Sequence, residues 1–306
     1  MRVQGMRKAG RVAAVCVLSL TSLSVPSAAQ SAPQAGARLA PGFVRIPGGT
    51  FMMGSPADEV GRENDEGPVR QVTVRPFAMS VTEVTRAEFK RFVTTTGYVT
   101  DAELSISGCG PKPESGPLRT WRNPGYEQTD EHPVVCVSRN DAMRYAAWLS
   151  RQVGIPLRLP TEAEFENAIR AGGQTLYPWG TDGNQGCTHG NIGDVKWRQF
   201  RPASQFTGTC DDGYTYTAPV GHYEANKYGL KDSSGNVWEW AQDCYHENFE
   251  GAPTDGSAWT TGTCELGVLR GASFDDGPRF ERSANRVRSA PGRGAWVFGI
   301  RLAHDQ

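Results

Sequence analysis

Cysteine content constrains the fold of this 306-residue chain more than any other feature of its sequence. The chain has 7 cysteines, and Cys16 lies in an N-terminal segment that we expect to be removed. The even number of cysteines that remains in an exported chain favours three disulfides. The sequence has no C-x-x-C pair, so it does not indicate a zinc ribbon. Many pairings are open, and sequential pairing is the simplest. The bonds would then be Cys109–Cys136, Cys187–Cys210 and Cys244–Cys264.

The first 29 residues have the pattern of a signal peptide. Basic residues between Arg2 and Arg11 precede an apolar stretch from Val12 to Val25, and small residues end at Ala29. The stretch is shorter than the ~20 apolar residues that span a bilayer. We therefore expect cleavage after Ala29, no stable membrane span in the mature chain, and a periplasmic or secreted location.

Composition indicates a single domain with much irregular backbone. Gly (36) and Pro (20) are abundant and collect in turns, while 8 Trp and 12 Phe can build a core. Residues 30–41, rich in Ala, Pro and Gly, predict a flexible tether before a domain over 42–306. Lys+Arg (32) and Asp+Glu (33) nearly balance, which argues against a nucleic-acid-binding protein or a polybasic membrane-surface protein.

Three helices are predicted from their end signals. In each, a Ser or Thr stands three residues before an acid, an apolar stripe follows, and a glycine ends the pattern. The predicted helices run from Thr85 to Gly97, from Ser138 to Gly154 and from Thr161 to Gly172.

Strand signals are shorter. Residues 43–46 and 50–54 flank Pro47-Gly48-Gly49 and predict a hairpin, and residues 71–74 alternate like a strand. After Gly172 we expect loops and short strands held by two of the disulfides. These elements together predict an α+β fold.

A set of motifs occurs in a fixed order along the chain: FVRIPGGTFMMG at 43–54, VTEVT at 81–85, RLPTEAEFE at 158–166, YPWG at 177–180, GNVWEW at 235–240, LRGASF at 269–274 and FGIR at 298–301. Together these segments resemble the formylglycine-generating-enzyme family, whose members are also called sulfatase-modifying factors. The resemblance covers nearly all of residues 42–303 and implies a variant of the C-type lectin fold with little regular structure. The family includes copper-dependent oxidases that convert a sulfatase cysteine to formylglycine, domains attached to non-haem iron sulfoxide synthases, and members of unknown role.

The same resemblance implies two structural calcium sites. Calcium takes hard oxygen ligands, and a glycine-rich turn can supply carbonyls. Without the resemblance these residues would be interpreted as turn formers. One site would use the side chains of Asp232 and Glu239 with the carbonyls of Gly235 and Val237; the other would use the side chains of Asn191 and Asp212 with the carbonyls of Ile192 and Tyr214.

The reactive position of the family departs from its pattern here. In the copper enzymes two cysteines follow the arginine that corresponds to Arg270, and their places hold Asp276 and Glu281. Cu(I) is a soft ion that thiolates hold, whereas carboxylates are hard ligands. We therefore expect no copper at this position and no formylglycine formation by the copper route.

Charged residues cluster around that position, close to Ser273. The cluster could be an acid–base pair, a site for a metal or a cationic ligand, or an exposed polar loop with local ion pairs. The sequence favours the exposed loop. Iron has no support, because His132, His189, His222, His246 and His304 are scattered. The other members of the cluster are Asp275, Arg279 and Arg282.

Two functions remain open. The first is an oxidoreductase of this family acting on an unidentified substrate. The alternative is a non-catalytic, lectin-like module that binds a peptide, glycan or small-molecule ligand and is stabilised by calcium. A purely structural role in the cell envelope is a third. Fold alone does not decide among them.

Overall fold

The computed structural model describes residues 38–110, 116–202 and 208–306. The predicted signal peptide and most of the predicted tether lie outside these residues. Near the start of the described residues, Ala40 is buried, and its backbone N–H donates a hydrogen bond to His304 Nε2 (3.3 Å). The packed chain therefore includes the end of the segment predicted to be a tether. Within the described residues, no helix combines the length and apolar character needed to cross a membrane.

The three longest helices begin at the predicted caps. Each cap hydroxyl accepts the N–H of the acid three residues later, and that acid accepts the cap N–H in return. The first two end at Gly97 and Gly154, both left-handed. The third ends one residue earlier than predicted, at Ala171 with φ 44°. These helices are α1 (Arg86–Thr96), α3 (Arg139–Val153) and α4 (Glu162–Arg170).

Shorter helical turns connect the remaining loops. Two of them, α5 and α6, lie on either side of the Asn191–Asp194 loop, and Asp194 caps α6 by accepting the N–H groups of Lys196 and Trp197. The short elements are α2 (Asp101–Leu104), α5 (Gly186–His189), α6 (Val195–Phe200), and the 3-10 turns η1 (Asn64–Glu66) and η2 (Gly183–Gln185).

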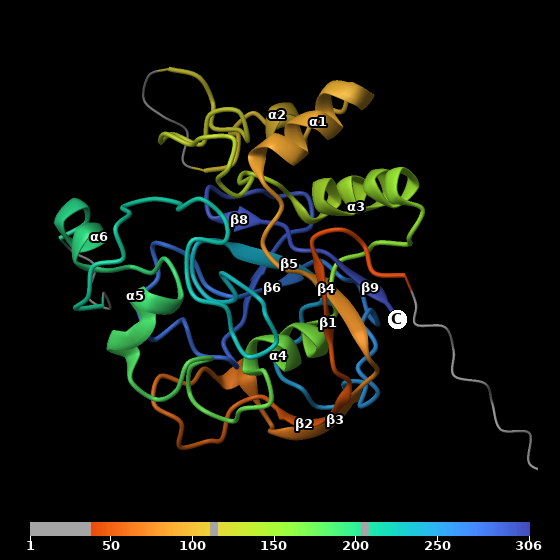
Figure 1. Ribbon diagram of the computed structural model, residues 1–306, viewed down its shortest axis with the longest axis vertical. Coiled ribbons are helices and arrows are strands. Elements are labelled where there is room, and N and C mark those ends of the chain that lie inside the picture. The colour runs from red at the N-terminus through yellow and green to blue at the C-terminus, as the bar shows by residue number, and fades with distance from the viewer. Residues whose placement is uncertain (1–37, 111–115, 203–207) are drawn as a thin grey trace, which may run out of the picture. The chain divides into compact units, whose positions relative to one another are not determined.

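In the part of the chain that the structure describes, the strands form three small sheets. Their orders are β1-β4-β9, β2-β3 and β7-β6-β5-β8, and pairing is antiparallel except between β5 and β8. Figure 1 shows β5 and β6 between the α1–α3 group at the top of the view and the β2–β3 pair at the bottom. The strands are β1 (Phe43–Ile46), β2 (Gly49–Met53), β3 (Arg70–Val74), β4 (Phe77–Ser80), β5 (Trp238–Cys244), β6 (Gly267–Arg270), β7 (Val287–Ser289), β8 (Phe298–Gly299) and β9 (Ala303–Asp305).

The predicted hairpin between residues 43–46 and 50–54 is wrong. β1 pairs with β4, and β2 pairs with β3. A Cβ at Gly48 would meet Pro76 and the Val74 carbonyl at 2.6 Å, so the backbone there packs against the β3–β4 connection. The Pro47–Gly49 link thus passes the chain from one sheet to another, and each strand buries its apolar side against a later partner.

Two apolar clusters form the core. One gathers Phe89, Phe92 and Tyr145 from α1 and α3 with Trp240 and Leu269 from β5 and β6. The other packs α4 against β2, β3 and β4. All three disulfides follow the sequential pairing, which confirms that prediction.

Candidate functional site: the carboxyls of Asp276 and Glu281

The segment from Ser273 to Glu281 follows β6 and lies against the loop that precedes β5. Gly235 N–H donates to Gly271 O (2.7 Å), and Phe274 N–H donates to Asn236 O (3.1 Å). Gly271 (φ 100°) and Ala272 (φ 60°) are left-handed, which turns the chain sharply out of the strand. Two segments that both belong to the family resemblance are therefore adjacent in space.

Asp276 has two close hydrogen-bond partners. Trp238 Nε1 donates to its Oδ2 at 2.7 Å, and Ser273 Oγ lies 2.5 Å from the same oxygen. Ser273 Oγ is also 2.8 Å from Asp275 Oδ1, so one hydroxyl joins the two acids. Burial, reinforced by the charge of Asp275, raises the pKa of Asp276 to about 7. This carboxyl can therefore exchange a proton near neutral pH.

Glu281 is more deeply buried, with 1% of its surface exposed. Ser234 Oγ donates to its Oε2 at 2.5 Å, and its Oε1 has no hydrogen-bond partner. Burial raises the pKa of Glu281 well above its usual value, and the charges of Asp276 and Asp212 add to that effect. Glu281 is thus a buried acid with one carboxyl oxygen that has no hydrogen-bond partner.

The interpretation of this region as an exposed loop with local ion pairs is wrong. Arg282 is buried and pairs with Glu66 (2.6 Å) and Glu59 (3.0 Å), and Arg279 pairs with Glu63 (3.0 Å). These glutamates lie in and before η1, more than 200 residues earlier in the chain, and they form ion pairs with the arginines of the loop. Sequence reasoning considered only neighbours along the chain and therefore missed these partners.

Arg270 does not face the carboxylate pair. Its guanidinium is fully buried against α4, where it contacts Glu162 (3.2 Å) and Glu166 (2.8 Å), and it donates to two loop carbonyls. Its place is structural, and Ser273 is the residue of this segment that contacts the acids. Trp238 and Ser234, which sequence reasoning did not single out, complete the surroundings.

A cavity of about 290 Å³ has Ser234 in its wall. Trp179 stacks between Tyr177 and His189, with ring centroids at 5.2 Å and 5.6 Å. Glu224, Lys227 and other residues line the remainder. Because Ser234 donates to Glu281, this cavity and the buried acid share one wall residue.

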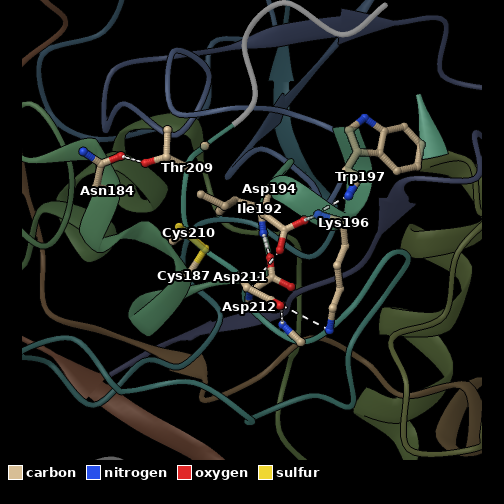
Figure 2. Close-up of a disulfide and its surroundings, with 12 residues drawn as sticks. Asn184, Cys187, Ile192, Asp194, Lys196, Trp197, Thr209, Cys210, Asp211 and Asp212 are labelled. Atoms are coloured by element: carbon tan, nitrogen blue, oxygen red, sulfur yellow. Dashed lines mark hydrogen bonds and ion pairs between the residues drawn. A yellow bond between two sulfur atoms is a disulfide. The ribbon is translucent and has the colours of Figure 1, made fainter. Parts of the chain in front are cut away.

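One predicted calcium site lies at the Asn191 loop (Figure 2). Figure 2 shows that Asp212 accepts Ile192 N–H, at its Oδ2 and at 2.9 Å. Its Oδ1 accepts Tyr214 N–H, also at 2.9 Å, so each oxygen has one hydrogen-bond donor. Asn191 Oδ1 is buried and has no hydrogen-bond partner, which leaves one open oxygen for a cation. Burial raises the pKa of Asp212 to about 7.

Sequence reasoning missed Asp194, which lies beside this site. Its Oδ2 accepts Asp212 N–H at 3.0 Å, and potential ligand atoms of Cys187, Asp194 and Asp212 lie within 4.8 Å of one another. Figure 2 shows that the Cys187 sulfur is bonded to Cys210, so the group offers no thiolate.

The other predicted calcium site contains a further acid. Both carboxylate oxygens of Glu239 accept a hydrogen bond from Arg301 Nε (3.0 and 2.8 Å). The carbonyl oxygen of Gly235 accepts a hydrogen bond from Val237 N–H at 2.9 Å. Asp232 Oδ1 is buried and has no hydrogen-bond partner. Glu83, from the segment before α1, is also buried here, and its Oε2 has no hydrogen-bond partner either. Open buried carboxylate oxygens fit a hard cation.

The histidines have separate surroundings. His132 Nδ1 lies 3.0 Å from Thr217 Oγ1, His246 stacks on Trp259, and His304 accepts the Ala40 N–H. These contacts are structural, and they add no support for an iron site.

Comparison with known proteins identifies the family. The model of the sulfatase-modifying factor enzyme 1-like domain matches residues 28–306. The formylglycine-generating enzyme of Thermomonospora curvata is 36% identical, with 87% of this chain and 94% of that protein covered. A mouse protein, inactive C-alpha-formylglycine-generating enzyme 2, is 35% identical over 85% of this chain and 81% of its own.

Solved structures agree with the fold. PvdO from Pseudomonas aeruginosa is 36% identical, with a TM-score of 0.71 over 86% of this chain and 94% of that one. Treponema denticola variable protein 1, at 18% identity and a TM-score of 0.63 over 86% and 95% of the two chains, shares the fold alone. The fold is thus the α+β, C-type-lectin-like type predicted from the sequence, and this chain belongs to the formylglycine-generating-enzyme, or sulfatase-modifying-factor, family.

Proposed function

We propose that this protein is an exported member of the family that does not make formylglycine by the copper–thiolate route and instead uses Asp276 and Glu281 as an acid–base pair in an oxidoreductase reaction. The observation that carries the proposal is the pair of acids at the family's cysteine positions, of which Glu281 is buried and Asp276 is half-buried. Two acids with raised pKa values can hold and transfer protons near neutral pH.

The oxygens of the pair support distinct roles. Asp276 is held by Trp238 and Ser273 and can act as the proton-exchanging base. Glu281 is buried and can keep its proton beside Ser234, which lies in the wall of the cavity. Neither carboxyl can form the thiol adducts of the copper enzymes, and neither suits Cu(I).

The first test concerns formylglycine formation. The mature oxidised protein, supplied with copper, is incubated with a Cys-x-Pro-x-Arg peptide, and aldehyde is measured by mass spectrometry. We expect no aldehyde and no stoichiometric Cu(I) binding. An active formylglycine-generating enzyme assayed in parallel is the control, and aldehyde formed by the wild-type protein would refute the proposal.

The second test concerns the protonation state of Glu281. Infrared difference spectra of the wild type and Glu281→Gln at neutral pH should show a protonated carboxyl band that the variant lacks. The exposed Glu127→Gln is the matched control and should leave that band unchanged. If Glu281 is ionised at neutral pH, its assignment as the proton-holding acid is wrong.

The binding-module alternative rests on the cavity beside Ser234 and on relatives whose names describe them as inactive. If the protein is a binding module, Asp276→Asn and Glu281→Gln would change its affinity for the ligand, and neither the wild type nor the variants would convert the ligand to a product. Product analysis on a bound ligand, once one is found by screening, separates the two functions.

Export is part of the proposal. Three disulfides in a chain of this size suit an oxidising compartment. N-terminal sequencing of the mature protein from cell fractions tests it, and a start at Gln30 is expected.

A further inference from the structure

One hydroxyl contacts two carboxyl groups in the loop after β6. Ser273 Oγ lies 2.5 Å from Asp276 Oδ2 and 2.8 Å from Asp275 Oδ1. Ser273 is buried, and both aspartates are half-buried. A serine hydroxyl carries one proton and two lone pairs, so it can donate to only one of these oxygens at a time. The second contact is favourable only when that carboxyl is protonated and donates to the hydroxyl.

Trp238 adds a second donor on one side of this bridge. Its Nε1 is a donor only, and it donates to Asp276 Oδ2 at 2.7 Å. If both aspartates were ionised, one oxygen at Ser273 would lack a donor, and two like charges so close oppose full ionisation. If both were protonated, the strong contacts that donors make with an ionised oxygen would be lost. One proton for the two acids satisfies every contact.

Charged and titratable groups on the neighbouring segments have partners of their own. The Tyr126 hydroxyl donates to a backbone carbonyl (2.7 Å), and Glu281 has its hydrogen bond with Ser234 (2.5 Å). The Asn191 loop packs against Asp276 through a backbone hydrogen bond of 2.7 Å, and its acid, Asp194, accepts backbone N–H groups with both oxygens. The contact at Ser273 therefore depends on the two aspartates themselves.

We propose that Asp275 and Asp276 share one proton through the hydroxyl of Ser273, which relays it between the two carboxyls. When Asp276 holds the proton, Asp276 donates to Ser273 Oγ, and Ser273 donates to Asp275 Oδ1. In the relay, the O–H bond of Asp276 breaks as its proton bonds to Ser273 Oγ. The original O–H bond of Ser273 breaks as that proton bonds to Asp275 Oδ1. The hydroxyl ends unchanged, and one proton has moved from Asp276 to Asp275.

The relay deepens the proposed function, and it rests on that function for its use in a reaction. A base that has taken a proton from a substrate must lose it before it acts again. Asp275 gives Asp276 an outlet for that proton. Burial raises the pKa of Asp275, and the positive charge of exposed Arg201 opposes the rise, so Asp275 can also release the proton.

Titration of the aspartate carboxyls by nuclear magnetic resonance tests the shared proton without a substrate. With isotope-labelled aspartate, the signals of Asp275 and Asp276 in the wild type should both follow the same two titration steps, because the proton belongs to the pair. Asp275→Asn should leave Asp276 with a single step, about one pH unit or more below the upper step of the wild type, because the neighbouring charge is gone. Asp276→Asn should have the same effect on Asp275. The proposal is overturned if each aspartate titrates in one step that replacement of the other does not move.

Variants of Ser273 test the relay. The bridging hydroxyl stabilises the state with one proton over the states with none and with two, so Ser273→Ala should bring the two titration steps closer together. Ser273→Thr keeps a hydroxyl and should retain most of the separation, and exposed Asp58→Asn is the control that should leave both steps unchanged. An unchanged separation in Ser273→Ala would show that the hydroxyl relays no proton.

Two further readouts keep the outcome unambiguous. The indole N–H signal of Trp238 reports whether Asp276 keeps its place in each variant, and the aspartate variants decide the sharing by themselves if a Ser273 variant does not fold. None of these titrations needs turnover. The shared proton can therefore fail while the acid–base role of Asp276 and Glu281 stands, and the reverse outcome is equally visible.

Discussion

Asp276 and Glu281 have properties that their neighbours in space determine. Ser234 and Trp238, from the segment before and at the start of β5, contact the acids directly. Glu281 is buried and Asp276 is half-buried, and in both this loss of solvation favours the neutral acid over the anion. The same two residue types on an exposed loop would be ordinary ionised side chains.

The pH dependence of stability should report Asp276. Its pKa is about 7 in the folded protein against a usual 3.8, so the folded state binds the proton more tightly. Stability from this group is therefore complete below pH ~4 and is lost as pH rises to about 7. The unfolding free energy of the wild type, minus that of Asp276→Asn, should fall over this range with a slope of at most ~1.4 kcal/mol per pH unit.

Urea unfolding at several pH values measures that difference. Exposed Asp58→Asn serves as the control and should track the wild type. Asp275 titrates together with Asp276, so the slope belongs to the pair. Parallel curves for the wild type and Asp276→Asn would contradict the raised pKa.

The helices show how local signals act at the scale of an element. Each predicted cap forms both of its reciprocal hydrogen bonds, because these involve groups only three residues apart. Strand pairing has no such local basis. β1 pairs with β4, and the paired residues lie between 31 (Ile46 and Phe77) and 37 (Phe43 and Ser80) positions apart in the sequence.

The cap of α1 should contribute measurably to stability. Thr85 Oγ1 accepts Glu88 N–H (3.2 Å), and Glu88 Oε2 accepts Thr85 N–H (2.8 Å). Thr85→Ala removes the acceptor and should cost ~1 kcal/mol of unfolding free energy in urea titrations. Thr85→Ser keeps the hydroxyl and should recover most of that loss. Equal destabilisation by both variants would mean that the methyl group, and not the cap, matters.

An ionic network connects parts of the molecule that are distant in sequence. Arg270 on β6 and Arg286 contact Glu162 on α4, while Arg282 contacts Glu66 of η1. These groups are buried, so each charge depends on its partner. The network holds the loop with the carboxylate pair between α4 and η1.

Removal of one charge from this network should be severe. Glu166 is fully buried, and its oxygens accept Gly54 N–H, Arg170 Nε and Arg270 Nη2, each at 2.8 Å. Glu166→Gln preserves the shape but leaves two buried guanidinium groups undercompensated. We expect a loss of about 3–5 kcal/mol in unfolding free energy by denaturant titration. Exposed Glu250→Gln is the control, and a loss below ~1 kcal/mol for Glu166→Gln would show that the network is not essential.

The sequence by itself determined the family, the fold class and the helix starts, because these depend on an ordered set of segments and on short-range hydrogen bonds. It also located Asp276 and Glu281. It left several cysteine pairings open, and the structure decided for the sequential one. Only the tertiary structure decided that Glu281 is buried and Asp276 half-buried, that β1 leaves the predicted hairpin, and that Arg301 forms an ion pair with Glu239. Burial and charge pairing depend on which distant segments exclude water from a group, and one-dimensional spacing does not contain that information.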